Sequence, residues 1–339
     1  MSKYDVTIAI PVFNVAAFVE KSLRSALTQT VGNIEVLILN DCSTDNSVEV
    51  IRGIAKEYQC LLTIYNAPEN AGVGVMRNKA IELAQGDYLY FLDSDDIMTP
   101  DCIELMLSIA RKDNMDLVIG SYINVREKGE TLEKEDVLKF EKPDEFAKYA
   151  FTKRYGYVGG VWNKLMKTEK LRSNHISFPN FRVGEDVPFI FRLITNVQRV
   201  VLIDDVTYHY VTRPGSLCQY NPRAIIPKGE IDTHVASKFL LKEILLDNKG
   251  KVYYVPMLCI VMDYCLDTAR VMIEKRNVLE ERVPPSVLKN MLSFSVSLHD
   301  ILKYGGKRDF FNYLLCHTPI SFVSLFYVIR KVIRDRRHK

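Results

Sequence analysis

Three carboxylates within four positions, Asp93, Asp95 and Asp96, directly follow an apolar run at residues 88–92. The run has the length and aromatic content of a buried strand. Anions gathered at a strand end repel one another, and a hard divalent cation such as Mg²⁺ or Mn²⁺ relieves that repulsion because it prefers carboxylate oxygens. The pattern therefore indicates a metal site. The alternative is an acidic turn in which Ser94 and Asp95 only cap the following helix.

Polar side chains follow other apolar runs in the same way. Asn14, Asp41 and Asp93 each come directly after a predicted strand. In open α/β sheets, ligands bind outside the carboxyl ends of the strands. We therefore expect these three side chains to gather at one edge of a sheet.

The spacing of apolar residues predicts strands that alternate with helices, which favours parallel pairing through right-handed crossovers. The expected fold class is α/β. A charged stretch at 126–143 is expected to be a solvated excursion. Strands are predicted over 6–12, 34–39, 61–65, 88–92, 116–125 and 199–203, and helices over 16–28, 47–58, 73–84, 100–112, 145–154 and 187–195.

The character of the sequence changes near residue 220, beyond which long helical patterns replace the strands. We therefore expect a helical C-terminal region over 221–339. Its end combines an apolar, aromatic segment at 319–329 with a basic tail at 330–339. This combination suits a helix lying in the surface of an anionic membrane. A core or dimer helix with a solvated tail is the alternative, which leaves a homodimer open.

Composition limits the function classes. The chain has 339 residues, 47% of them hydrophobic and 26% charged, as in an ordinary globular protein. The net charge of +3 and the scattered basic residues give no reason to expect nucleic acid as a partner. Seven scattered cysteines without a CxxC pair fit a reducing setting, and Asp5 and Pro11 interrupt the first apolar run. We expect a cytoplasmic protein, with peripheral membrane contact as the variant that the tail suggests.

Seven motifs spread over the first two thirds of the chain carry a family resemblance. They are Ile10-Pro11-Val12-Phe13-Asn14, Leu39-Asn40-Asp41-Cys42-Ser43-Thr44-Asp45, Glu69-Asn70-Ala71-Gly72 with Arg77-Asn78, Phe91-Leu92-Asp93-Ser94-Asp95-Asp96, Trp162-Asn163-Lys164, Gly184-Glu185-Asp186, and Tyr208-His209-Tyr210 with Arg213 and Ser216. In this order they resemble family 2 glycosyltransferases of the GT-A fold, of the bacterial kind that assembles polysaccharides. Met76 and Cys42 depart from the small residue and the glycine that are common at those positions.

The resemblance implies a GT-A domain over 1–220, with a Rossmann-like, mostly parallel sheet and flanking helices. Residues 1–99 would form the nucleotide-sugar half and residues 100–220 the acceptor half. It also implies that a sugar is transferred with inversion from a sugar nucleotide, taken here as a UDP-sugar, to a hydroxyl of a lipid-linked or growing saccharide.

The family also implies a divalent metal, Mn²⁺ or Mg²⁺, on the donor diphosphate. Asp95 is the first expected ligand. Asp93 is the second and would also hold ribose or bound water, while Asp96 supports the turn or caps the following helix. His209 is the weakest candidate ligand, because a lone histidine between two tyrosines more often packs than binds metal.

Family position gives the role of general base to Asp186, with Glu185 orienting the acceptor or the base. A carboxylate suffices because the acceptor hydroxyl becomes more acidic as the new bond forms. The alternative is that both acids simply occupy a helix N-terminus, where negative charge is favourable.

On the donor side, Asp41 resembles the carboxylate that accepts a hydrogen bond from uracil, and an Asx turn is the alternative. Arg77 either pairs with phosphates, orients the acidic turn or is a plain helix-surface charge. Trp162 either stacks on an acceptor sugar or packs in the core. The residues expected at the nucleotide sugar are Pro11, Phe13, Asn14, Asp41, Asn70, Gly72, Arg77, Asp93, Ser94, Arg213 and Ser216, the last two on a mobile closing segment.

Two competing functions remain. A nucleotidyltransferase also uses an α/β sheet, a nucleotide and Mg²⁺, but it usually shows a glycine-rich basic loop where this chain has Phe13-Asn14-Val15-Ala16. A catalytically silent, membrane-docked assembly factor would keep the fold, and the presence of both Asp95 and Asp186 argues against it.

Overall fold

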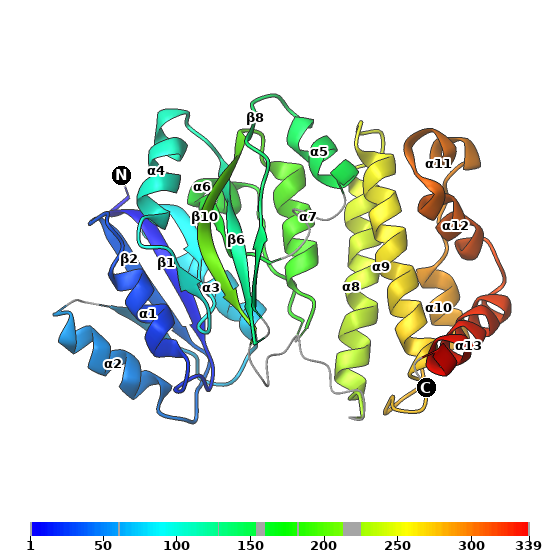
Figure 1. Cartoon of the computed structure of the whole chain (residues 1–339), viewed down its shortest axis with the longest axis horizontal. Helices are drawn as coiled ribbons and strands as arrows, with labels where there is room; N and C mark the ends of the chain where they lie inside the picture. Colours follow the sequence, from blue (N-terminus) through cyan, green and yellow to red (C-terminus); the bar gives the residue numbers. More distant parts are fainter. Residues whose placement is uncertain are drawn as a thin grey trace. The chain divides into compact units, whose positions relative to one another are not determined.

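The computed structural model describes residues 2–59, 62–127, 129–153, 160–181, 183–212 and 225–337. The chain divides into two compact units (Figure 1). The first unit comprises Met1–Phe146, Gly156–Asn180 and Glu185–Gln219, and the second comprises Ala147–Tyr155, Phe181–Gly184 and Tyr220–Lys339.

A single sheet organises the first unit. Its strands run in the order β3-β2-β1-β4-β9-β6-β10-β5, with β7 paired to β6 and β8 to β10. Pairing is parallel from β3 to β4 and mixed beyond, because β9 lies antiparallel between β4 and β6. The strands are β1 (Tyr4–Val12), β2 (Ile34–Asn40), β3 (Thr63–Asn66), β4 (Gly86–Phe91), β5 (Ile97–Met98), β6 (Leu117–Arg126), β7 (Gly129–Glu133), β8 (Leu138–Phe140), β9 (Lys164–Lys167) and β10 (Val200–Val211).

Helices cover both faces of this sheet, so the α/β fold class is confirmed. One face packs Val6, Ile8 and Ile10 of β1 against α1, α2 and α4, which is why these strands are almost continuously apolar. On the other face Phe91 of β4 lies edge-on to Phe189 of α7, with ring centroids 6.5 Å apart. The helices with residues in this unit are α1 (Val19–Leu27), α2 (Ser47–Glu57), α3 (Val73–Leu83), α4 (Cys102–Lys112), α5 (Glu145–Lys153), α6 (Thr168–Ser173) and α7 (Asp186–Asn196).

Two sequence predictions need correction. The stretch 126–143 is exposed, but it is not simply an excursion, because it contains β7 and β8 and both join the sheet. The strand predicted over 199–203 continues to Val211, and Tyr208, His209 and Tyr210 are part of it. The continuation was missed because polar residues at 204–205 interrupt the apolar pattern where the ladder shifts register.

The second unit is helical, as expected for the C-terminal region. Its long helix α9 is largely buried, with α8, α12 and α13 packed against it. No helix in the described ranges is long and apolar enough to cross a membrane. The helices here are α8 (Lys228–Asp247), α9 (Tyr254–Glu274), α10 (Pro285–Met291), α11 (Leu298–Tyr304), α12 (Lys307–Cys316) and α13 (Ile320–Arg337).

Close packing between β6 and β10 gives a direct test of this sheet. A Cβ added to Gly120 of β6 would lie 2.6 Å from Cγ2 of Thr207, a fully buried residue of β10. We predict that Gly120→Ala lowers the free energy of unfolding by about 1–3 kcal/mol, because the buried Thr207 has no room to yield. Chemical denaturation measures this change.

The matched control is Gly53→Ala on the exposed side of α2, where nothing lies within 4 Å of the added Cβ. Alanine is the better helix former there, so this variant should gain roughly 0.5–1 kcal/mol. Equal effects of the two substitutions would contradict the observed β6–β10 contact.

Candidate active site

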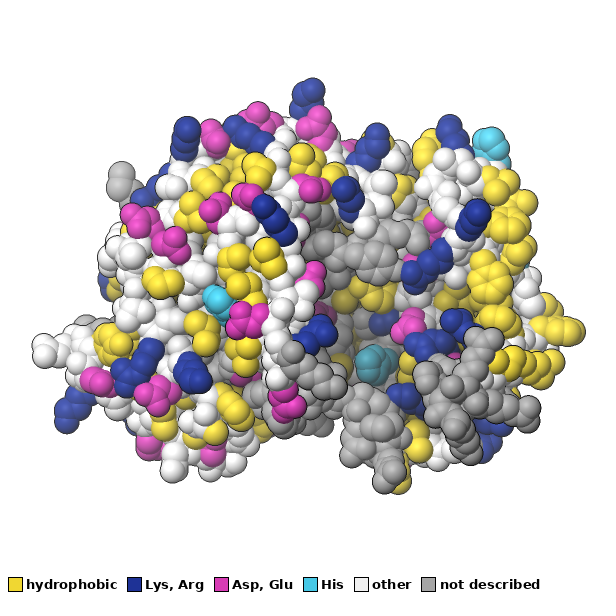
Figure 2. Space-filling model, viewed as in Figure 1, with side chains coloured by type: hydrophobic (Ala, Val, Ile, Leu, Met, Phe, Trp, Pro, Cys, Tyr) yellow, Lys and Arg dark blue, Asp and Glu magenta, His cyan; other side chains and the backbone are white. Residues whose placement is uncertain are grey.

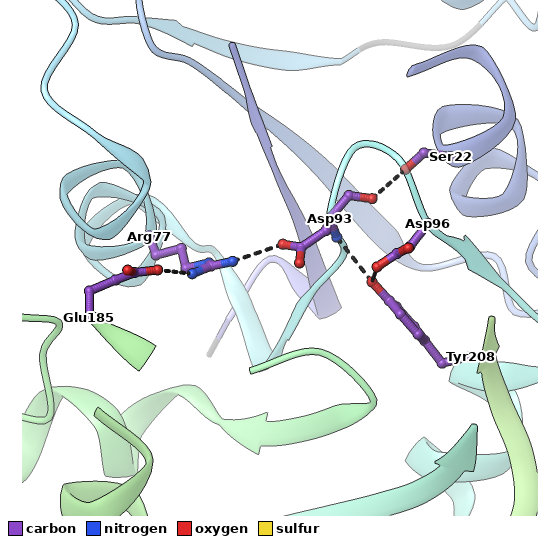
Figure 3. Close-up of polar contacts among 6 residues, drawn as sticks. All are labelled: Ser22, Arg77, Asp93, Asp96, Glu185 and Tyr208. Carbon is purple, nitrogen blue, oxygen red and sulfur yellow. Dashed lines mark hydrogen bonds and ion pairs between the residues drawn. The ribbon is translucent and has the colours of Figure 1, made fainter. Parts of the chain in front are cut away.

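One buried arginine joins the two acidic motifs of the sequence. Arg77, on α3, donates from Nη1 to Oε1 of Glu185 and from Nη2 to Oδ1 of Asp93, both at 2.8 Å (Figure 3). The side chain of Arg77 is 8% exposed and that of Glu185 is 9% exposed, so water screens the Glu185 pair little. The sequence stretches around positions 93 and 185 are thus brought together. The interpretation of Arg77 as a surface charge is wrong, and its contacts are those of a residue that orients the acidic turn.

The electrostatics follow from this burial. Burial alone would lower the pKa of Arg77, but Asp93 and Glu185 outweigh it and the pKa is raised. Burial raises the pKa of Glu185, Arg77 opposes this effect, and the neighbouring Asp186 adds to it. The arginine therefore stays charged, while the carboxylates around it carry more negative charge than it neutralises.

The acidic turn is held in place from β10. The buried hydroxyl of Tyr208 donates to Oδ2 of Asp96 at 2.6 Å and accepts from the backbone N–H of Asp93 at 3.3 Å (Figure 3). The backbone N–H of Val211 donates to the other oxygen of Asp96 at 2.7 Å, and Ser22 Oγ donates to the Asp93 carbonyl at 3.0 Å. Burial, with Asp93 beside it, raises the pKa of Asp96 to about 8.

Asp96 is therefore not a helix cap. The residue at the N-cap position of α4 is Asp101, whereas the carboxylate of Asp96 accepts hydrogen bonds from Tyr208 and Val211 of β10. Its other predicted role, support of the turn, is the one that its contacts match. Ser94 is buried inside the same turn.

An aromatic cluster lies behind the turn. Trp162 stacks on Tyr208 and Tyr210, with ring centroids 4.9 Å and 5.3 Å away, and meets Tyr122 of β6 edge-on at 4.6 Å. Trp162 thus makes the contacts of a packed aromatic residue. Stacking of Trp162 on an acceptor sugar stays a prediction.

The same cluster bears on His209. Tyr208 and Tyr210 both reach Trp162 from one face of β10, so strand alternation directs His209 to the opposite face. Over the part of the chain that the structure describes, no three His, Cys, Asp or Glu side chains lie together as a ready-made metal cage. Asp93, Asp95 and His209 therefore do not form one by themselves, and the geometry does not favour His209 as a ligand.

The acidic turn nevertheless fits a cation that a substrate helps to bind. Mg²⁺ is commonly held by one or two carboxylates together with substrate phosphates rather than by an all-protein cage. Asp93 gives one oxygen to Arg77, and Asp95 lies two residues further along the same turn. With Glu185 and Asp186, these carboxylates outnumber the single arginine among them, and a divalent ion would offset the excess negative charge.

The N-terminus of α3 holds Asp41. Oδ1 of Asp41 accepts from the N–H of Ala71 at 2.7 Å, and Oδ2 accepts from Gly72 N at 2.8 Å and from Asn70 Nδ2 at 3.0 Å. These contacts bring together Asp41, Asn70 and Gly72, three of the residues expected at the nucleotide sugar. The expected Asx-turn role belongs to Asp45, whose carboxylate accepts from the N–H and hydroxyl of Ser47.

The ends of β1 and β2 are tied together beside this carboxylate. Oδ1 of Asn14 accepts from the N–H of Thr44 at 2.8 Å, while Pro11 is buried in β1 and Phe13 is 45% exposed. Cys42 has φ +58°, a conformation that costs a residue with a Cβ about 1–2 kcal/mol, which explains why glycine suits this position.

Asp186 is the first residue of α7, directly after Glu185 at the N-cap position, and its Oδ1 accepts from the N–H of Val187 at 2.8 Å. Helix α3 also touches this segment, since a Cβ on Gly74 would lie 3.2 Å from Cγ of Glu185. Asp186 therefore occupies the helix N-terminus that the alternative interpretation requires, and it also lies next to the Arg77 pair. Arg213 and Ser216 lie outside the described residues.

The comparisons with known proteins identify the domain that carries this geometry. Residues 7–174 match the family model described as Glycosyl transferase family 2. Residues 7–174 of this chain therefore form a domain of this family. Its family 2 domain is that of a transferase enzyme.

Individual relatives agree. EpsH of Bacillus subtilis is 32% identical over 231 residues, which cover 66% of this chain and 65% of EpsH, so the chain spans just under two thirds of that relative. The structure resembles S. aureus TarS in complex with UDP-GlcNAc, with a TM-score of 0.59 at 18% identity over 92% of this chain and 90% of that one. It also resembles the mannosyltransferase PcManGT from Pyrobaculum calidifontis in complex with GDP-Man and Mn²⁺, with a TM-score of 0.52 at 16% identity over 99% and 88% of the two chains. At these identities the likeness shows the fold, and the GT-A fold with a C-terminal helical region is confirmed.

The sequence motifs of this family 2 domain suggested no role for Lys164, but in the structure its side chain ties together the segment from Gly160 to Asn163. Its buried Nζ donates to the carbonyl of Gly160 and to Oδ1 of Asn163, both at 3.0 Å, and Asn163 Nδ2 in turn donates to the Gly120 carbonyl. Asn163 has φ +52°. Its place in the Trp162-Asn163-Lys164 motif was the one hint of a role for Lys164 in the sequence. The contacts with backbone carbonyls that explain the motif can be seen only in the structure.

We predict that removing Arg77 destabilises the family 2 domain strongly. Arg77→Met leaves Asp93 and Glu185 with an uncompensated buried charge, which should cost about 3–5 kcal/mol of unfolding free energy. The control on the same helix is Lys79→Met, which removes an exposed pair with Glu82 and should cost less than about 1 kcal/mol. Unfolding of both variants by denaturant measures the two losses of free energy. Similar losses for the two variants would contradict the bridge from Arg77 to Asp93 and Glu185.

The burial of Lys164 should make the stability of the fold depend on pH. Burial lowers its pKa to about 8, against 10.5 ordinarily, although Glu135 and Asp186 act to raise it. Between these values the unfolded chain binds more protons than the folded one, so this group makes stability rise with pH. From pH 8 to pH 10, the free energy of unfolding of the wild type should rise by about 2 kcal/mol relative to that of Lys164→Met. Denaturation at each pH measures this change. A difference that does not change with pH would show that Lys164 titrates normally.

Proposed function

We propose that this chain transfers a sugar, with inversion, from a nucleotide-sugar donor to a hydroxyl of a lipid-linked or growing saccharide. The observation that carries the proposal is the Arg77 bridge, which fixes the acidic turn beside the segment that bears Asp186. A metal-binding turn and a general base must stand on either side of the same reacting sugar. The donors bound by TarS and PcManGT are nucleotide sugars, and a UDP-sugar is our choice for this chain.

At the donor base, Asp41 is the proposed acceptor for the uracil N–H. A carboxylate oxygen has two lone pairs, and Oδ1 of Asp41 uses one of them on Ala71. The other remains for the base, with Pro11 and Phe13 as its floor. The contacts to Asn70 and Gly72 hold the carboxylate in its orientation. Asn14, Ser94 and Asp93 are proposed to face the rest of the nucleotide sugar.

At the diphosphate, Asp95 and Asp93 are the proposed ligands of Mn²⁺ or Mg²⁺. The metal, when bound, would stabilise the negative charge that develops on the leaving phosphate. The protein's own contribution is to hold the turn rigid. Tyr208 fixes Asp96, and Arg77 fixes Asp93, so neither carboxylate has to reorganise as charge develops.

At the acceptor, Asp186 takes the proton of the attacking hydroxyl. The hydroxyl attacks the anomeric carbon from the face opposite the leaving diphosphate, which inverts the configuration. Glu185 is already held by Arg77, and we therefore propose it as a positioning residue for Asp186. Trp162, with Tyr208 and Tyr210 behind it, is the proposed acceptor contact.

A panel of sugar nucleotides, each assayed for Mn²⁺-dependent binding and turnover, tests the function. Asp95→Ala should abolish metal-dependent donor binding because it removes the first ligand. Asp186→Asn should keep donor binding but lose transfer by about 10²–10⁴-fold, the usual contribution of a general base.

The matched control is Asp101→Asn, which changes an exposed carboxylate just before α4 and should behave as wild type. Transfer at the normal rate by Asp186→Asn would refute the base assignment. A complete panel in which no sugar nucleotide binds would refute the proposed function.

A further inference from the structure

Exposed apolar side chains are concentrated near the end of the second unit. Of the eighteen large hydrophobic side chains that are exposed among the described residues, ten lie within positions 298–333. Figure 2 shows hydrophobic side chains gathered over the edge where α11, α12 and α13 lie in Figure 1. We call this set the C-terminal apolar surface. It consists of Leu298, Leu302, Tyr304, Phe310, Phe311, Leu314, Phe322, Leu325, Ile329 and Ile333.

Helix α13 shows that this exposure is patterned. Phe322, Leu325, Ile329 and Ile333 recur at spacings of three, four and four residues, which places them on one side of a helix. They are between 48% and 64% exposed. Residues on another side of the same helix, such as Val323 and Tyr327, are buried and supply the packing that the fold needs. The exposed apolar stripe is therefore additional to the core.

The surface is continuous from one helix to the next. The ring of Phe311 on α12 lies 5.7 Å from that of Phe326 on α13, and α11 packs against α12. Leu302 of α11 is 63% exposed. Soluble proteins rarely expose contiguous apolar patches of more than a few hundred Å² unless the patch binds something.

Charge distinguishes the candidate partners. Residues 298–339 hold nine lysines and arginines but only three acidic residues, whereas the whole chain has a net charge of only +3. The rest of the chain is therefore net negative. Lys303, Lys307 and Arg330 are exposed alongside the apolar side chains. A second copy of the chain docked through the same surface would bring two basic surfaces together.

We propose that the C-terminal apolar surface docks on an anionic phospholipid bilayer. The apolar side chains enter the boundary between headgroups and acyl chains, and the basic side chains bind lipid phosphates, as for helices that lie in the membrane plane. The proposal concerns a surface separate from the transfer site and goes beyond the proposed function. The sequence indicated a single helix with a basic tail at the membrane surface, and the proposal extends this contact to the helices α11, α12 and α13.

Sedimentation of the full chain with vesicles tests the proposal. We expect binding to phosphatidylcholine vesicles that contain phosphatidylglycerol, weak binding to pure phosphatidylcholine, and release as salt rises from about 0.05 to about 0.5 M. Phe322→Ser combined with Leu325→Ser and Ile329→Ser should weaken binding about tenfold or more. Lys303→Gln combined with Lys307→Gln and Arg330→Gln should remove the preference for anionic vesicles.

A second measurement locates the contact without weakening it. The fluorescence of a tryptophan introduced by Phe322→Trp should be quenched by brominated acyl chains. A tryptophan introduced by Leu246→Trp, at a similarly exposed position on α8, should not be quenched. The fluorescence of native Trp162 in the wild type is the baseline for both variants. No binding of the wild-type chain to anionic vesicles would overturn the proposal. So would a dimer, detected by light scattering, that the three serine substitutions dissociate. Because vesicle binding needs no donor, either result leaves the proposed function unaffected.

Discussion

The buried charge of Arg77 is the constraint on which the candidate site depends. A guanidinium that is largely shielded from water must be matched by carboxylates, and here they come from two distant parts of the chain, Asp93 after β4 and Glu185 before α7. The negative charge exceeds what Arg77 neutralises, because Asp95 and Asp186 also lie nearby. A fold would not retain this excess for stability alone, since burying ion pairs gains little. A bound cation, as proposed for this site, would offset the excess.

Helix α3 turns this local pairing into a site. Its N-terminus holds Asp41, its second residue touches Glu185, and Arg77 one turn later reaches Asp93 and Glu185. Candidate residues for the base, the diphosphate and the acceptor are therefore positioned by a single element. The turn has a second support from β10, where Tyr208 contacts Asp93 and Asp96 together. Rigid support from two elements suits a site that must stabilise developing charge without reorganising.

The strands, helices and acidic motifs could be predicted from the sequence, but the long-range contacts between them could not. Strict alternation of strands and helices located the first half of the sheet, because each buried parallel strand is a short apolar run. It failed for the short strands β5 and β9, for β7 and β8 in the charged stretch, and for residues 204–211 of β10, where a register shift breaks the pattern. The acidic motifs were recognised, but the sequence left Asp96 between a support of the turn and a helix cap, and it left the role of Arg77 undecided. Their roles depend on partners more than a hundred residues away, Tyr208 and Glu185, which local spacing does not reveal.

The proposed transfer requires that the turn at 93–96 and Asp186 face each other across a metal-bound donor diphosphate. A crystal structure of the chain soaked with Mn²⁺ and a non-hydrolysable sugar nucleotide, with manganese located by anomalous scattering, tests it directly. We expect manganese about 2.2 Å from a carboxylate oxygen of Asp95, with the anomeric carbon between the metal and Asp186. Manganese bound elsewhere, or Asp186 on the far side of the molecule from the donor sugar, would refute this arrangement.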